Sequence, residues 1–287
     1  MILVADSGSS KTDWLLDQPG SAPAEFFTDG LNPYFLTEKE IVRKLQDQLQ
    51  GLIAKAAQVS EIYFFGAGCS SPDRHEIVSN ALSQLFPKAY ISIDSDLLGS
   101  AYATCGHDKG LCCVLGTGSN ISFFDGEDVA EGKHGLGYIL GDEGSGSWLG
   151  KRLITDYLYN VMPTDVHEMF HNNYTLDKAT VIKQVYQQPG ANSYLASFAR
   201  FLNKVRYTAY GRHVLNSSFL EFIETNIKTY PEYRQYKCHF VGSIAFYFAD
   251  ELRALCAEHH IQAGKIIRKP IHDLLAFILQ RNSEEAV

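Results

Sequence analysis

A polar turn between two short apolar segments occurs twice in the chain and constrains its fold more than any other feature. The first turn, over residues 6–11, is built of small polar residues, and the second, over 116–120, is rich in glycine. Short apolar runs on both sides of each turn predict strands over 1–5, 12–16, 111–115 and 121–124. Two such units in corresponding places predict a duplicated layout with two halves of similar design.

The rest of the pattern alternates helices with buried strands, which is typical of α/β layer folds. A capping box at Thr37 and Glu40 begins one helix. Further strands are expected over 62–65, 90–93 and 239–241, and further helices over 74–86, over most of 147–236 and on both sides of Pro270. We predict an N-terminal domain over 1–106 and a C-terminal domain over 107–269. A helical insert over 151–236 belongs to the second domain, and a helix over 270–287 packs back on the first.

Composition excludes several classes of protein. The 287 residues include 25 Lys and Arg against 33 Asp and Glu, a formal charge of −8, which argues against a nucleic-acid partner. No apolar run approaches the roughly 20 residues of a transmembrane helix, and residues 1–6 are too short for a signal peptide. We therefore expect a cytoplasmic protein that binds no membrane, with its six cysteines reduced and used as small apolar fillers.

The two turns carry the residue types that bind phosphate. In Asp6-x-Gly8-x-x-x-Thr12, the glycine lets backbone amides approach a ligand and the threonine adds a hydroxyl donor. A carboxylate at the strand end, Asp6, can hold a hydrated magnesium ion opposite those donors. The second turn, Gly116-Thr-Gly-Ser-Asn120, offers another amide cradle. Together the turns favour one phosphate chain held from both sides.

Acidic residues mark two further places where chemistry is expected. Asp94 and Asp96 follow the predicted strand over 90–93, where α/β proteins place ligands and a carboxylate can accept a proton from a hydroxyl. We expect one of them to cap or orient the next helix and the other to act as a base. Five glycines surround Asp142 and Glu143 between positions 135 and 146, more than a solvated loop requires.

In this order, the motifs resemble the sugar kinase, heat-shock chaperone and actin superfamily of ATPases. Within it, the chain is similar to the N-acetylglucosamine kinase and BadF/BadG/BcrA/BcrD ATPase family. The resemblance rests on Asp6-Ser-Gly-Ser-Ser-Lys-Thr12, Gly116-Thr-Gly-Ser-Asn120 and Leu140-Gly-Asp-Glu-Gly-Ser145, and it runs over nearly the whole chain. It implies two ribonuclease-H-like (actin-like ATPase) domains with ATP and a sugar in the cleft between them.

The resemblance also implies a role for each matching residue. Asp96, which is followed by x-x-Gly-Ser, matches the family's catalytic base, and Asp6 would hold Mg²⁺ through water. The implied nucleotide ligands are Asp6, Gly8, Ser9, Lys11, Thr12, Gly116, Thr117, Gly118, Gly242 and Ser243. The implied sugar ligands are Asn32, Asn120, Asp142 and Glu143. Ser243 departs from the family pattern, which has a second glycine at that place.

The function expected from these residues is ATP-dependent phosphorylation of an amino sugar, N-acetylglucosamine to its 6-phosphate. Glucosamine, N-acetylmuramic acid and anhydro-sugars are alternative substrates. A BadF-type ATPase activator, whose relatives hold an iron–sulfur cluster with cysteines across a dimer, is one alternative function. A non-catalytic sensor of ATP or sugar is another, although such a sensor could dispense with Asp96. The aromatic-rich region 151–236 could also form a homodimer face.

Overall fold

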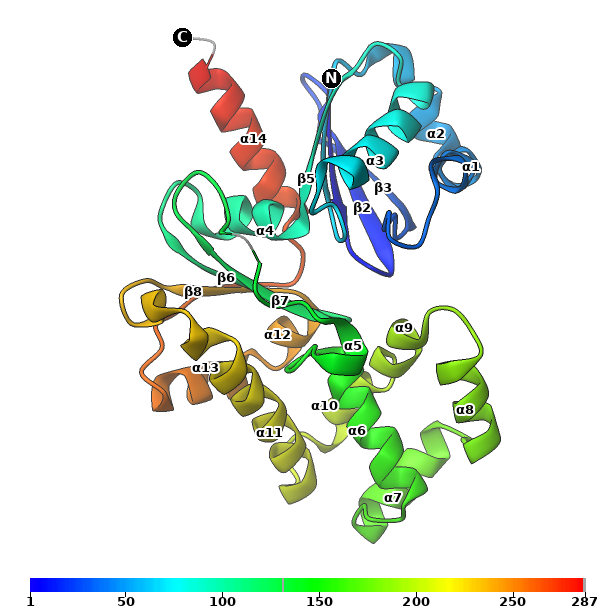
Figure 1. The fold of residues 1–287 in the computed structure, drawn as a ribbon, viewed down its shortest axis with the longest axis vertical. Coiled ribbons are helices and arrows are strands. Elements are labelled where there is room, and N and C mark those ends of the chain that lie inside the picture. The colour runs from blue at the N-terminus through cyan, green and yellow to red at the C-terminus, as the bar shows by residue number, and fades with distance from the viewer. Residues whose placement is uncertain (131, 286–287) are drawn as a thin grey trace. The chain divides into compact units, whose positions relative to one another are not determined.

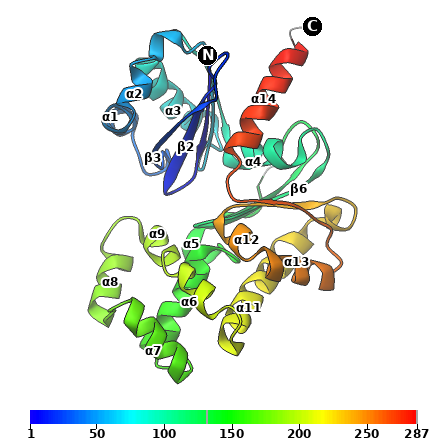
Figure 2. The same ribbon diagram turned by 180° about the vertical axis from the view of Figure 1, so that it is seen from behind.

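The computed structural model describes residues 1–130 and 132–285, which divide into two compact units (Figure 1; Figure 2). Unit 1 comprises Met1–Asp108, Phe124–Val129 and the chain from Lys269 onward. Unit 2 comprises Lys109–Phe123 and Ala130–Arg268. The chain therefore passes more than once between the units, and its last segment belongs with its first.

Unit 1 is built on a mixed five-stranded sheet in the order β3-β2-β1-β4-β5. The strands are β1 (Ile2–Ser7), β2 (Lys11–Leu16), β3 (Ala24–Asp29), β4 (Glu61–Gly66) and β5 (Tyr90–Ser95). β1 pairs antiparallel with β2 and parallel with β4, and β4 pairs parallel with β5. The carboxyl ends of β1, β4 and β5 therefore meet at one edge of the sheet. The sequence did not predict a range for edge strand β3, because this segment lacks a long apolar run.

Helices cover both faces of this sheet. They are α1 (Glu38–Gln48), α2 (Gln50–Ile53), α3 (Pro72–Leu85), α4 (Asp96–Cys105) and α14 (Ile271–Glu285). α1 contacts α3, whereas α14 contacts α4, β1 and β2 on the other side (Figure 1). The predicted capping box is confirmed, because the Thr37 side chain accepts from the Glu40 amide while Glu40 accepts from the Thr37 amide. Of the helix predicted over 270–287, residues 286 and 287 lie outside the described residues.

Unit 2 contains a four-stranded sheet in the order β7-β6-β8-β9. Its strands are β6 (Gly110–Leu115), β7 (Ser119–Phe124), β8 (Cys238–Val241) and β9 (Ala263–Ile267), with β8 parallel to both β6 and β9. The helices predicted before Pro270 are present over Ser243–Tyr247 and Ala249–Glu258, but strand β9, which lies between them and Pro270, was missed. Its local pattern is too short to define a strand by its period, and pairing with β8 places it in the sheet.

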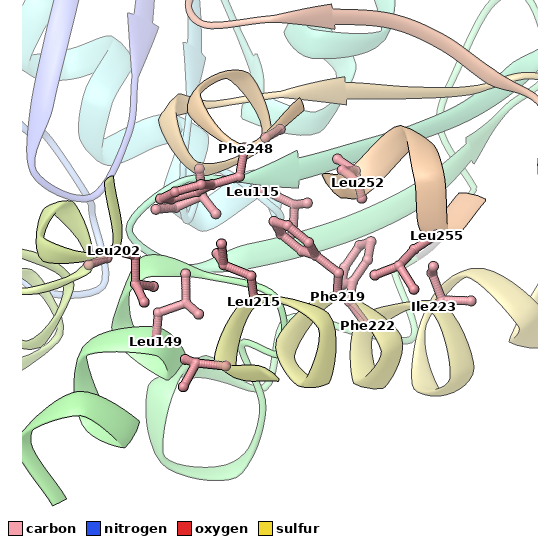
Figure 3. Close-up of a cluster of buried hydrophobic side chains, with 14 of the residues drawn as sticks. Leu115, Leu149, Leu202, Leu215, Phe219, Phe222, Ile223, Phe248, Leu252 and Leu255 are labelled. Atoms are coloured by element: carbon pink, nitrogen blue, oxygen red, sulfur yellow. The ribbon is translucent and has the colours of Figure 1, made fainter. Parts of the chain in front are cut away.

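Helices account for most of unit 2, and the predicted helical content of 147–236 is confirmed. They are α5 (Gly137–Leu140), α6 (Gly146–Leu158), α7 (Thr164–Asn173), α8 (Lys178–Tyr186), α9 (Ala191–Ala196), α10 (Leu202–Val205), α11 (Ala209–Thr225), α12 (Ser243–Tyr247) and α13 (Ala249–Glu258). Side chains of α6, α11 and α13 pack with Leu115 of β6 in one apolar cluster (Figure 3). None of the helices within the described residues is long and apolar enough to cross a membrane.

Truncating the aromatic centre of this cluster should destabilise unit 2. Phe219 is 0% exposed, so Phe219→Ala should cost about 3–5 kcal/mol through lost burial and the cavity left behind. Leu220, its neighbour on α11, is 39% exposed, so Leu220→Ala serves as the matched control and should cost less than about 1 kcal/mol. Urea unfolding followed by fluorescence measures both, and equal losses would contradict this assignment of the core.

Candidate functional site

The carboxyl edge of the unit 1 sheet carries two acidic groups of the predicted site. Asp6 lies near the end of β1, and Asp96 is the first residue of α4, directly after β5. The helix cap is Ser95, whose hydroxyl accepts from the Leu98 amide at 3.2 Å. The expectation that a carboxylate caps this helix is therefore wrong, because the serine between Asp94 and Asp96 takes that position.

Asp6 and Asp96 act on each other electrostatically. The pKa of the Asp6 carboxyl is raised to about 7. Burial is the largest cause, and the negative charges of Asp96 and Asp13 act in the same direction. Burial also raises the pKa of Asp96, to about 6, against the lowering effect of backbone amides at the start of α4. Two carboxylates that resist ionisation together gain from a shared proton or a cation, and their oxygens are the ligands that Mg²⁺ prefers. This donor set therefore fits a magnesium ion.

Asp94 faces a different group of charges from Asp96. Burial raises its pKa, and its carboxylate accepts a hydrogen bond from the Ser92 hydroxyl at 3.2 Å. The charges that act on it include those of His75, Asp128 and Arg281. Of the two carboxylates after β5, it is Asp96 whose charge acts on Asp6.

The first turn is a closed hairpin tip. The Gly8 amide donates to the Lys11 carbonyl at 2.9 Å, and the hydroxyls of Ser7 and Thr12 lie 2.8 Å apart. Thr12 is buried and its hydroxyl also donates to the Asp29 carbonyl, so this side chain ties the tip to the neighbouring strand. Ser9 and Lys11, in contrast, are exposed at the tip.

The loop that carries Asn32 packs against this tip. A Cβ added to Gly30 would lie 2.5 Å from the Gly8 carbonyl oxygen and 2.6 Å from that of Ser9, so only glycine allows the approach. Asn32 in turn lies against Gly68, where a Cβ would be 2.3 Å from its Oδ1 atom. The structure therefore packs this loop against the first turn at Gly30 and against the end of β4 at Asn32.

Sequence reasoning missed a buried carboxylate next to Asp6. Asp13 pairs directly with Asp6 across β1 and β2, and Lys11 and Lys269 each form an ion pair with it. An aspartate inside the apolar segment Thr12–Leu16 signals a buried charge that needs a cation. Nothing in the sequence pattern identifies Lys269, which follows more than 250 positions later, as that cation.

In unit 2, the second turn is fastened to the predicted acidic residues. The Gly116 amide donates to the Gly118 carbonyl at 2.9 Å, and Asp142 Oδ1 accepts from the Ser119 amide at 3.1 Å. A Cβ on Gly118 would lie 2.8 Å from Asp142 Oδ2. Burial raises the pKa of the Asp142 carboxyl, against the lowering effect of the Ser119 hydrogen bond.

The start of α6 is joined to the same turn. The Gly146 amide donates to the Gly116 carbonyl at 2.8 Å, and the Ser147 amide donates to the Thr117 carbonyl at 3.0 Å. Ser145 caps the helix by accepting from the Trp148 amide. The glycine-rich acidic segment thus holds a turn of backbone amides against the start of a 13-residue helix.

Two other predicted sugar ligands lie near this segment. Asn120 packs against Gly135, where a Cβ would be 2.9 Å from its Nδ2 atom. Glu143 accepts a hydrogen bond from Asn226 Nδ2 at 3.2 Å. Asn226 is buried at the end of α11 and was missed by sequence reasoning, because a single asparagine after a helix usually reads as a cap.

Two cavities that share residues lie in unit 2, and the smaller one adjoins the second turn. One, of about 210 Å³, is lined by Gly116, Thr117, Gly146, Ser193, Ala196, Ser197, Ser243 and Ile244. The other, of about 390 Å³, is lined by Ala196, Ser197, Ala199, Arg200, Asn203, Ser243, Ile244, Tyr247 and Phe248. The structure therefore brings the predicted residues Gly116, Thr117 and Ser243 together. Sequence reasoning missed the contribution of residues 193–203, because serine and alanine on helices carry no chemical signature.

Gly242, directly before Ser243, can only be glycine. Its φ of 125° is unfavourable for other residues, and a Cβ there would lie 2.3 Å from the Leu115 carbonyl oxygen. Its amide donates to the Ile267 carbonyl at 2.9 Å, which joins the end of β8 to β9. This glycine therefore sets the path of the chain from β8 into α12.

The chain resembles a solved structure over nearly its whole length. A candidate N-acetylglucosamine kinase from Porphyromonas gingivalis shares 34% sequence identity and superposes with a TM-score of 0.93. The match covers 98% of this chain and 100% of that protein. The chain belongs to the N-acetylglucosamine kinase-like family. No model of a known protein family matches it.

Other solved structures share the fold of this N-acetylglucosamine kinase-like protein. A candidate N-acetylglucosamine kinase from Chromobacterium violaceum matches at 18% identity with a TM-score of 0.71, covering 96% of this chain and 98% of that one. A ROK family glucokinase from Streptomyces griseus, solved with glucose and AMPPNP, matches at 12% identity and a TM-score of 0.58, over 95% and 97%. These likenesses confirm the predicted α/β class and actin-like ATPase fold.

Substituting Gly242 in this family member should destabilise unit 2 because of the added Cβ and not only because of the backbone angle. Gly190→Ala is the matched control: Gly190 also has a positive φ, of 78°, but nothing lies within 4 Å of an added Cβ. The control should cost about 1–2 kcal/mol, and Gly242→Ala should cost clearly more. Thermal and urea unfolding measure the difference, and equal costs would refute the steric argument.

Proposed function

We propose that the protein is an ATP-dependent sugar kinase that converts N-acetylglucosamine to its 6-phosphate. The observation that carries the proposal is the pair of mutually repelling carboxyl groups, Asp6 and Asp96, at the carboxyl edge of the unit 1 sheet. The 34% identity to a candidate N-acetylglucosamine kinase over 98% of the chain supports the choice of substrate.

Asp96 is the general base of the proposed reaction. Its carboxylate accepts the proton of the sugar 6-hydroxyl while that oxygen bonds to the γ-phosphorus of ATP and the bond from phosphorus to the ADP oxygen breaks. A pKa of about 6 suits this role, because the group is mostly ionised at neutral pH and still more basic than an ordinary aspartate. Backbone amides at the start of α4 donate to this carboxylate and orient it after β5.

Asp6 and the second turn deal with the phosphate chain. Asp6 would hold Mg²⁺ through water, and the ion would supply positive charge that neutralises the β- and γ-phosphates. Ser9 and Lys11 would bind phosphate oxygens at the first turn, where Gly8 closes the hairpin tip. The amides of Thr117 and Gly118 would bind phosphate oxygens at the second turn, near the start of α6, where the helix dipole favours anions.

The larger cavity of unit 2 is the proposed adenosine site. Its volume of about 390 Å³ lies within the range of about 300–1,000 Å³ for ligand pockets. Ser243, which directly follows Gly242, lines this cavity, and Tyr247 and Phe248 supply apolar surface for a base. Because Ser243 also lines the smaller cavity beside Gly116, adenosine and phosphates can occupy adjoining spaces.

We assign the sugar hydroxyls to the remaining polar residues implied by the family resemblance. Asn32 contributes from unit 1, and Asn120, Asp142 and Glu143 contribute from unit 2. Carboxylates and amides suit this task because they accept or donate two hydrogen bonds to neighbouring sugar hydroxyls. Asn226 orients Glu143 by donating to one of its carboxylate oxygens.

The alternative of an iron–sulfur ATPase activator has less support in the structure. Such a cluster needs thiolates that two subunits can share at a surface, but all six cysteines are buried. Cys112 and Cys113 lie in β6 and are both 0% exposed.

Sugar-dependent release of ADP tests the proposal directly. The protein with MgATP is assayed alone and with N-acetylglucosamine, glucosamine and N-acetylmuramic acid, and the product is located by ³¹P NMR. We expect turnover with N-acetylglucosamine and phosphorylation at the 6-hydroxyl. ATP hydrolysis independent of sugar would favour an activator, and ATP binding without turnover would favour a sensor.

Asp96→Asn should lower kcat by about 10²–10⁴-fold, because the variant keeps the shape of the side chain and loses the base. Asp94→Asn is the matched control, because Asp94 is separated from Asp96 only by Ser95. This variant should keep kcat within about threefold. Steady-state rates with N-acetylglucosamine compare the two variants. Near-normal turnover by Asp96→Asn would remove this residue from the proposed role.

The rate should fall in mild acid. The pKa of Asp96 is raised to about 6, so protonation removes the base as the pH drops through that value. We expect kcat/KM to be level at neutral pH and to fall about tenfold per pH unit well below pH 6. Because Asp6 and Asp96 interact, the midpoint belongs to the pair. A rate that stays level down to pH 4.5 would contradict this assignment.

A further inference from the structure

Asp13 is a buried carboxylate held by two ammonium groups. Only 4% of the residue is exposed, yet its two oxygens have separate partners. Lys11 Nζ lies 3.2 Å from Oδ2, and Lys269 Nζ lies 2.6 Å from Oδ1. One cation would be enough to neutralise the carboxylate, so the second must serve another purpose or be redundant.

The two lysines differ in how firmly they are held. Lys269 has the shorter contact with Asp13, and its ammonium also lies 5.0 Å from the centre of the Phe27 ring. Phe27 on β3 is the residue directly opposite Asp13 on β2. It directly precedes Pro270, whose carbonyl accepts from the Leu274 amide at the start of α14. α14 packs on β1 and β2, so the backbone that carries Lys269 is fixed to the same sheet.

Lys11, in contrast, projects from the hairpin tip. Its side chain is 56% exposed against 32% for Lys269, and its contact with Asp13 is the longer one. It lies in the turn to which the proposed function assigns the phosphates. An exposed ammonium on a flexible stem can change partners, provided that the group it leaves is not stranded as an unpaired buried charge.

We propose that Lys269 is a positioning residue for nucleotide binding: as the permanent counterion of Asp13, it frees Lys11 to exchange that carboxylate for the phosphate chain. This inference rests on the proposed function, because it takes the hairpin tip to be a phosphate site. Lys269 itself touches no nucleotide. Its effect passes through Asp13, which keeps a cation whether Lys11 is present or turned away.

The charges around this cluster fit such an exchange. Lys11 and Lys269 both lower the pKa of Asp6, whereas Asp13 and Asp96 raise it, so three carboxylates face two lysines here. Of the two lysines that pair with Asp13, removing Lys269 would leave only Lys11. Lys11 could then bind phosphate only by leaving a buried carboxylate unpaired.

Equilibrium binding of MgADP by calorimetry, together with steady-state kinetics, tests the proposal. Lys269→Met should weaken MgADP binding and raise the KM for MgATP about tenfold, which corresponds to about 1.4 kcal/mol, with kcat within about twofold. Lys269→Arg keeps the cation and should stay within about twofold of the unaltered protein. A purely structural role would lower the melting temperature without this split between KM and kcat.

The double variant Asp13→Asn/Lys269→Met decides the mechanism. Without the carboxylate, Lys11 needs no release, so the double variant should bind MgADP as well as Asp13→Asn alone. If Lys269→Met weakens MgADP binding tenfold both in the unaltered protein and in Asp13→Asn, Lys269 contacts the nucleotide and the proposal is overturned. Unchanged binding by Lys269→Met would also overturn it. If the unaltered protein binds MgADP but phosphorylates no sugar, only the proposed function fails. If it binds no MgADP, both fail.

Discussion

Repulsion between partly buried carboxyl groups at one edge of the unit 1 sheet is the constraint on which the rest of the site depends. Three parallel strands end there, which brings Asp6 and Asp96 close enough to raise the pKa of Asp6. A carboxyl whose pKa is raised in the folded state binds protons that the unfolded chain has already lost. The contribution of both groups to stability therefore falls as the pH rises from about 4 to about 7. At neutral pH the fold tolerates a charged pair that a divalent cation would relieve.

In the proposed function, unit 2 would bind anions by a different means. Its turn at Gly116–Gly118 offers backbone amides, and the hydrogen bonds from Gly146 and Ser147 fix that turn to the start of α6. No basic side chain is needed for such a cradle, because amide dipoles and a helix start already favour negative charge. Under the proposed function, a chain with a net charge of −8 would therefore bind phosphate largely through backbone amides. At the first turn, the proposed basic contribution comes from Lys11 of unit 1.

Local patterns in the sequence predicted much of this arrangement. The turn at Gly116, the acidic glycine segment around Asp142 and the strand before Asp96 are each defined by residues within a few positions of one another. The strand β9 and the partners Asn226 and Lys269 were missed because each depends on a segment that is distant in the chain. The cap of α4 was assigned to the wrong residue type: a serine flanked by two aspartates competes equally well for the helix amides.

The ladder between β1 and β2 shows why distant residues matter here. Asp6 and Asp13 are directly opposite on neighbouring strands, a pairing of like charges that destabilises a sheet. Lys11 follows from the local turn, but an exposed lysine alone would be tied permanently to Asp13. Lys269 arrives from the far end of the chain, just where α14 docks on the same strands. The return of the C-terminal segment to unit 1 thus does more than cover a sheet face. It brings a second cation to the strand pair that carries Asp6, and this allows two carboxylates to remain side by side.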